Sequence, residues 1–158
     1  MIELFDTIPN ILGEDEKLVR LIFSPFHIDK KNPTKLTPNA FRPPAGLDEV
    51  SVNRLSYTTA DVCKQHGKSM NSTNKTFFGL ASIQYKTVLA CKAFARASKL
   101  PNNPAHADIF LGVILQKGEP APAEINLILK ELATKARYFA DPNPESIEWL
   151  GENISDFD

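Results

Sequence analysis

Two histidines in this chain lie in patterns that could support acid–base chemistry. His106 and Asp108 follow a turn-forming Asn-Asn-Pro sequence and enter an apolar segment that favours a strand. Side chains two residues apart on a strand share a face, so the carboxylate would lie beside the imidazole, fix its tautomer and raise its basicity. His27 lies in a proline-rich stretch upstream. We predict catalytic roles for these three residues; the simpler alternative is that His106 holds the turn and Asp108 is an acid at the strand edge.

A second group of residues has side chains suited to holding anions. Arg42 and Arg54 could each bind a phosphate or carboxylate through two hydrogen bonds, and nearby lysines add positive charge. Aromatic residues lie among these charges, a pattern that suits nucleotides or single-stranded nucleic acid. The predicted ligand-binding residues are Arg42, Ser51, Arg54 and Tyr57. The alternative is that the aromatic residues belong to the core and the lysines are simply solvated.

Charge is distributed unevenly along the chain, although the net charge is only −1. Residues 1–16 contain five acids and no Lys or Arg, and residues 17–99 contain fourteen Lys or Arg against four acids. Residues 100–158 contain four basic residues against ten acids. This segregation favours either an anion-binding face in the middle of the chain or acidic terminal segments that fold back over a basic middle. The sequence leaves both interpretations open.

The chain lacks the short motifs of several common enzyme classes. Its seven glycines form neither a GxGxxG nor a Walker loop, and no GxSxG or HExxH sequence occurs. Cys63 and His66 lie three residues apart on a predicted helix, but structural zinc sites normally contain two such ligand pairs. We therefore predict no metal site and no cofactor, and interpret Cys63 as a small buried hydrophobic residue.

Length and composition favour one folded domain over the whole chain, 1–158. With 42% hydrophobic and 23% charged residues, such a chain can bury a core without disulfides or metals. Its apolar runs are far shorter than the roughly 20 residues needed to span a bilayer, and its acidic N-terminus is unlike a secretory signal. Only two cysteines occur, Cys63 and Cys91. We expect a cytoplasmic protein that does not engage membranes.

Hydrophobic periodicity predicts an α+β domain, with a mixed or antiparallel sheet of four to five strands and two to three helices. Strands are expected at 18–23, 50–55, 77–83 and 108–115, with a short helix or turn and then a strand within 86–100. The first of these could instead end a helix begun at Glu14. Helices are expected at about 58–67, near 123–139 and from Pro144. Segment 25–46 is predicted to be a long proline-rich loop, and 151–158 a mobile acidic tail.

Several short segments, taken in order, resemble a group of small, uncharacterised bacterial proteins. These segments are Ser24-Pro25-Phe26-His27, Asn39-Ala40-Phe41-Arg42-Pro43, Glu49-Val50-Ser51-Val52-Asn53-Arg54 and Asn103-Pro104-Ala105-His106-Ala107-Asp108-Ile109, within residues 20–110. The resemblance implies a bacterial origin and a shared site at His27, Arg42, Ser51, Arg54 and His106. The chain is more distantly similar to ADP-ribosyltransferase-type domains, but the late glutamate of those domains is not identifiable in it.

These observations support two main functional hypotheses. In the first, the chain is a non-enzymatic module whose basic middle segment engages an anionic partner, either nucleic acid or an acidic protein, with binding that weakens steeply as salt rises. In the second, it is an enzyme that acts on a nucleotide or another phosphate-bearing substrate, by ADP-ribosyl transfer, phosphotransfer or nuclease-like chemistry. The second hypothesis predicts that the histidines and arginines named above line one pocket. A structural role in a multi-protein complex is a third possibility.

Overall fold

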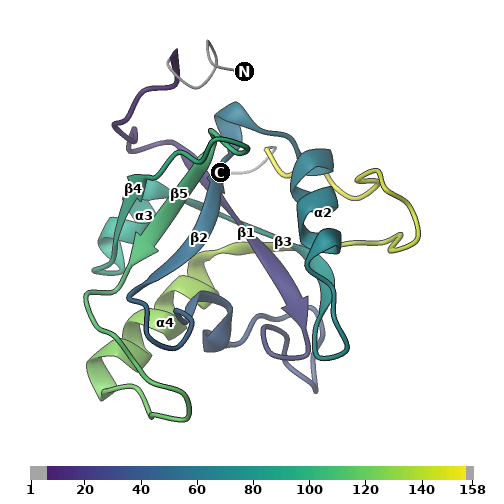
Figure 1. Ribbon diagram of the computed structural model, residues 1–158. Helices are drawn as coiled ribbons and strands as arrows, with labels where there is room; N and C mark the ends of the chain where they lie inside the picture. Colours follow the sequence, from purple (N-terminus) through teal and green to yellow (C-terminus); the bar gives the residue numbers. More distant parts are fainter. Residues whose placement is uncertain (1–6, 156–158) are drawn as a thin grey trace.

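The computed structural model describes residues 7–155 and contains a six-stranded antiparallel sheet with the order β4-β5-β2-β1-β3-β6 (Figure 1). The strands are β1 (Lys17–Ser24), β2 (Glu49–Arg54), β3 (Thr76–Gln84), β4 (Phe94–Ala97), β5 (His106–Phe110) and β6 (Arg137–Ala140). The helices are α2 (Ala60–Ser69), α3 (Tyr85–Ala90) and α4 (Ala123–Lys135), with 3-10 turns η1 (Pro38–Phe41) and η2 (Leu55–Tyr57). The α+β class and the antiparallel sheet are confirmed. The predicted number of strands, four to five, was too low.

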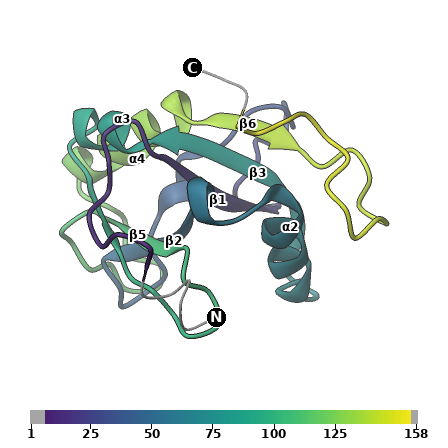
Figure 2. The same ribbon diagram turned by 90° about the horizontal axis from the view of Figure 1, so that it is seen from above.

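Helices lie on both faces of the sheet, with α3 and α4 on one and α2 on the other (Figure 2). Because strand side chains alternate between faces, Leu18 and Ile22 belong to the core under α4, whereas Val19 and Leu21 belong to the core under α2. The core under α2 draws no described residue from β2 or β5. On that face these two strands instead carry polar side chains, which become important for the site.

The largest correction concerns the end of the C-terminal helix. α4 ends at Lys135 rather than near residue 139, because residues 137–140 pair with β3 as β6, with Leu80 opposite Phe139. Phe139 also fits the apolar face of a longer helix, so periodicity alone could not separate the two structures. β5 occupies His106–Phe110 instead of 108–115, and residues 144–150 form turns and bends instead of a helix. The short helix and strand expected within 86–100 are present as α3 and β4.

Strands β1 and β2 pair over only a short distance and then diverge. Their ladder is limited to Leu18 opposite Arg54 and Val19 opposite Asn53, although β1 continues to Ser24 and β2 begins at Glu49. Figure 1 shows the two strands separating as a V, with η1 near its open end. The sheet therefore has an opening between two of its central strands.

Two buried ion pairs hold the terminal segments against the rest of the fold, one at β2 and one at α2. Arg54 donates to Glu16 over 2.6 Å, with the two side chains 1% and 8% exposed, and it also donates to the backbone oxygens of Pro9 and Ile11. Lys64 on α2 pairs with Asp141 at 3.1 Å. At these points the acidic terminal segments do fold back over the basic middle of the chain.

Other segments singled out in the sequence have defined positions. The proline-rich segment 25–46 contains η1 and an isolated antiparallel bridge between Ile28 and Leu36. Of the acidic tail 151–158, Ile154 is buried in the core under α2, and residues 156–158 lie outside the described part of the chain. No helix within residues 7–155 combines the length and apolar character needed to cross a membrane.

Candidate functional site

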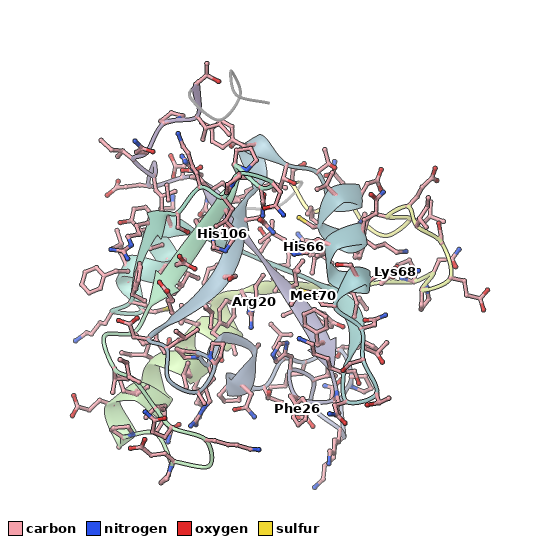
Figure 3. The ribbon with its side chains drawn as sticks, viewed as in Figure 1. Arg20, Phe26, His66, Lys68, Met70 and His106 are labelled. Atoms are coloured by element: carbon pink, nitrogen blue, oxygen red, sulfur yellow. The ribbon has the colours of Figure 1, made fainter. Side chains whose placement is uncertain are left out.

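The opening between β1 and β2 leads into a cleft of about 660 Å³. Its polar and charged lining residues are Arg20, His27, Arg42, Glu49, Ser51, Lys75, Ser98, His106 and Asp108. They come from β1, the proline-rich segment, β2, the turn before β3, the residue that follows β4, and β5. Figure 3 shows Arg20 on β1, His106 on β5 and Met70 after α2 around this opening. The cleft thus joins segments that are far apart in sequence.

Arg20 occupies the gap between the diverging strands. Its Nε donates to the backbone oxygen of Ala40 in η1 over 2.8 Å, and its Nη1 donates to that of Ser51 in β2 over 3.3 Å. Burial lowers the pKa of Arg20 to about 10, which still leaves the side chain charged at neutral pH. The guanidinium therefore replaces part of the missing ladder and also presents a positive charge to the cleft.

The three cations of the cleft are held by groups other than carboxylates. No carboxylate within residues 7–155 lies within ion-pair distance of Arg20, Arg42 or Lys75. Arg42 donates to the backbone oxygen of Glu119, and the Lys75 ammonium lies 4.6 Å from the centre of the Phe23 ring. By contrast, the ion-paired cations of the middle segment are Arg54, Lys64 and Lys86. The cleft therefore gathers three cations that no described acid neutralises.

The opposite wall of the cleft carries acids. The register of β2 and β5 places Ser51 opposite Asp108, and Glu49 lies one same-face step along β2. Desolvation, reinforced by Asp108 and Asp48, raises the pKa of Glu49. A ligand in the cleft would therefore meet positive charge near β1 and the proline-rich segment and negative charge near β2 and β5. Such a site suits an anionic group that adjoins a proton-donating group.

His106 has the geometry of a base in the cleft. Its Nδ1 lies 3.0 Å from the backbone oxygen of Ser98 and 2.7 Å from Ser98 Oγ. A carbonyl oxygen can only accept, so Nδ1 carries the proton and the neutral ring has its lone pair on Nε2. Nε2 is 3.9 Å from Asp108 Oδ1, so the carboxylate lies beside the ring nitrogen that carries the lone pair. The predicted pairing of His106 with Asp108 is therefore present, at a distance longer than a hydrogen bond.

His27 is held in the opposite tautomer. Its Nδ1 accepts a hydrogen bond from the backbone N–H of Phe23 at 3.0 Å, so the neutral ring carries its proton on Nε2. Burial, with further repulsion from Arg20 and Lys75, lowers the pKa of His27 to about 3. At neutral pH this imidazole is an uncharged hydrogen-bond donor and too weak a base to take up a proton.

Comparison of the chain with protein-family models, with curated proteins and with solved structures gives no match. The assignment of the site therefore depends on its geometry. Of the seven residues predicted to form a site, five line the cleft: His27, Arg42, Ser51, His106 and Asp108. Arg54 and Tyr57 are not among its lining residues. Arg54 is buried against Glu16, and its guanidinium carbon lies 4.8 Å from the centre of the Tyr57 ring.

Sequence reasoning missed Arg20, Glu49 and Lys75 as members of the cleft. Arg20 had a usable signal, because it is the only charged residue within the apolar run from Leu18 to Phe23. A lone arginine inside a buried strand needs polar partners, which suggests a gap or a site beside that strand. Lys75 lies in a polar turn and has no comparable signal.

The cysteines lie away from the charged cleft. Cys63 faces the core under α2, where burial raises the pKa of its thiol to about 11, and Cys91 lies in the core under α4. A thiol with a raised pKa is mostly protonated at neutral pH and is a poor nucleophile. Among residues 7–155, His, Cys, Asp and Glu side chains do not gather in groups of three that could hold a metal ion.

Proposed function

We propose that the chain is an enzyme that binds a phosphate-bearing small molecule of the nucleotide class in this cleft and transfers or hydrolyses its phosphoryl group. The observation that supports it most is the set of three cations, Arg20, Arg42 and Lys75, which line one cleft without a carboxylate partner among the described residues. Cations without a counter-charge bind a phosphate strongly because the ligand supplies the missing negative charge, and Arg20 is in addition desolvated by burial.

The two histidines have complementary roles in this reaction. His106 Nε2 takes the proton of a water molecule or hydroxyl group as its oxygen bonds to phosphorus, and Asp108 stabilises the imidazolium that forms. His27 donates its Nε2–H to a phosphoryl oxygen and keeps that proton. The bond from phosphorus to the leaving oxygen breaks, and this oxygen takes a proton from solvent. Arg20 and Lys75 balance the charge that builds up on the phosphoryl oxygens.

The rest of the cleft suits an organic group larger than phosphate. Four of its lining residues are large hydrophobic side chains left exposed: Phe26, Leu47, Met70 and Leu100. An aromatic ring and flexible apolar side chains beside cations favour a ligand that has a planar or apolar part as well as a charge.

A broad basic surface for nucleic acid or an acidic protein has weaker support. Arg54 and Lys64 are buried in ion pairs with acids from the terminal segments, and Lys86 pairs with Asp15. With these three cations neutralised, the middle segment offers less free positive charge to a large anionic partner than its sequence suggests, which favours a small ligand in the cleft.

Titration of the protein with inorganic phosphate and with ribose 5-phosphate tests the binding step. We expect both ligands to shift the backbone NMR signals of Arg20, Ser51 and Lys75, and Arg20→Gln to weaken binding. Arg137→Gln is the matched control. Arg137 lies on β6 and forms an exposed ion pair with Glu152, so this variant should bind both ligands normally. If phosphate leaves the cleft signals unchanged, or if both variants bind equally well, the proposal is wrong.

A further inference from the structure

A second pocket of about 210 Å³ continues the cleft along β2. Its polar lining residues include Asn53, His66, Asn102 and Asn103, and Leu100 lines both this pocket and the cleft. Ser51 in the cleft and Asn53 in the second pocket lie two residues apart on one face of β2. His66 and Met70, four residues apart, border the second pocket and the cleft respectively, and Figure 3 shows His66 on α2 and Met70 at its end. The two hollows are therefore adjoining parts of one groove.

The asparagines at the base of this pocket are held in a defined orientation. Asn103 Nδ2 donates to Asn53 Oδ1 over 2.7 Å, and Asn53 Nδ2 donates to the Cys63 thiol at 4.0 Å, a weak contact. The Asn53 oxygen and one Asn103 N–H are thus used, which leaves an Asn53 N–H as a donor and Asn103 Oδ1 as an acceptor for a ligand. Asn53 is only 6% exposed, so a ligand group that paired with it would be largely removed from water.

We infer that this pocket binds the heterocyclic base of the nucleotide and selects a base with an amino group beside a ring nitrogen, as in adenine. The Watson–Crick edge of adenine offers its amino N–H to Asn103 Oδ1 and its N1 to Asn53 Nδ2, the same complementarity of amide oxygen and amide N–H that a single asparagine uses on another edge of adenine in DNA. A base with a carbonyl group at the same position reverses both roles and leaves the two amides unpaired. This inference rests on the proposed function, because the cleft must hold the phosphate.

The two parts of the groove are neighbours along β2. Arg20 contacts the backbone oxygen of Ser51, and Asn53 lies one same-face step further along the strand. Two residues of a strand span about 6.7 Å. The residues assigned to the phosphate and to the base are thus neighbours along one strand, which is the arrangement that a single ligand lying along β2 requires.

Calorimetric titration with AMP, IMP and ribose 5-phosphate tests the inference, because IMP differs from AMP in the group beside the ring nitrogen. We expect AMP to bind about tenfold or more tightly than either of the others. Asn103→Leu should reduce AMP affinity to the level of IMP and leave ribose 5-phosphate unchanged. Arg20→Gln should weaken all three ligands and keep their order.

The outcomes separate the base pocket from the phosphate site. Equal affinities for the three ligands, with the loss in Arg20→Gln retained, would overturn the base pocket alone. A failure of all three ligands to bind would overturn both proposals. Because Asn103 also supports the turn before β5, NMR of the unaltered protein gives a second measurement. AMP should shift the side-chain amide signals of Asn53 and Asn103, whereas ribose 5-phosphate should not. Amide signals that do not shift on addition of AMP would contradict the inference.

Discussion

Arg20 and Ser51 are joined across the opening of the sheet, where Arg20 Nη1 donates to the backbone oxygen of Ser51 over 3.3 Å and β1 no longer pairs with β2. In a regular sheet this level would be closed by backbone hydrogen bonds. Here a charged side chain bridges part of the distance, and the remaining space is the cleft. The same divergence that costs the sheet several ladder bonds therefore creates the site.

We predict that Arg20→Gln lowers the affinity for inorganic phosphate by about 10–100-fold. A hydrogen bond to a charged group contributes about 1.5–3 kcal/mol, and this variant removes the charge nearest to the strand gap. Calorimetric titration at several salt concentrations measures the loss, and thermal melts show how much of the variant is folded. Lys130→Gln is a further control, because Lys130 is an exposed cation on α4 and is not among the lining residues of the cleft. An equal loss in the control would show that general surface charge controls binding.

We predict that His106→Gln lowers kcat on an aryl phosphate ester by about 100-fold or more, with a small change in KM, because general-base catalysis typically contributes that much. Ser98→Ala keeps the backbone oxygen that fixes the His106 tautomer and loses only the hydroxyl contact. Its rate should fall less than about tenfold. ¹⁵N NMR of the imidazole should find the proton on Nδ1 in both the unaltered protein and Ser98→Ala. Full activity of His106→Gln would exclude the assigned role.

His27 makes the free energy of unfolding depend on pH. Its pKa is lowered to about 3 in the folded chain and returns to about 6.5 on unfolding, so below pH 6.5 the unfolded state binds a proton that the folded state does not. The stabilising contribution is complete above pH 6.5 and is lost as the pH falls towards 3.

After allowance for partial solvent exposure, the free energy of unfolding should fall by about 1–2 kcal/mol between pH 6.5 and pH 4 through His27 alone. Urea unfolding of the unaltered chain and of His27→Gln at both pH values measures this term, because other titrating groups cancel in the difference. A His27 signal that titrates near pH 6.5 by NMR would disprove the explanation.

The parts of the fold that local patterns determine could be predicted from the sequence. Alternating side chains indicated that Ser51 lies on a strand and that His106 and Asp108 share a face, and these residues do line one cleft. Other features depend on distant partners. The residues of β6 also fit a helical pattern, and it is their pairing with β3 that makes them a strand. The short β1–β2 pairing is signalled in the sequence only by the lone Arg20 within an apolar run. The cleft arises from that short pairing, so its members from β1 and from the turn before β3 were not predicted.

Arg42 and Arg54 illustrate the same limit for charge. Both lie in the basic middle segment, and nothing local distinguishes one as a ligand-binding candidate from the other. What separates them is Glu16, 38 residues before Arg54, which pairs with it at 2.6 Å. Long-range pairing thus decides which cations remain available to a ligand.

This difference predicts opposite effects for the two arginines. Arg54→Met leaves the Glu16 carboxylate and two backbone oxygens without their partner, and removing one member of a buried ion pair typically costs about 3–5 kcal/mol. Urea unfolding should show that loss, whereas the fraction that remains folded should bind phosphate with normal affinity. Arg42→Met should lower the phosphate affinity and leave the free energy of unfolding almost unchanged, since Arg42 is only partly buried and has a single backbone partner. Glu16→Gln with Arg54→Met should recover part of the stability, because the variant no longer buries an unpaired carboxylate. A loss of phosphate affinity in folded Arg54→Met equal to that in Arg42→Met would place Arg54 in the binding site after all.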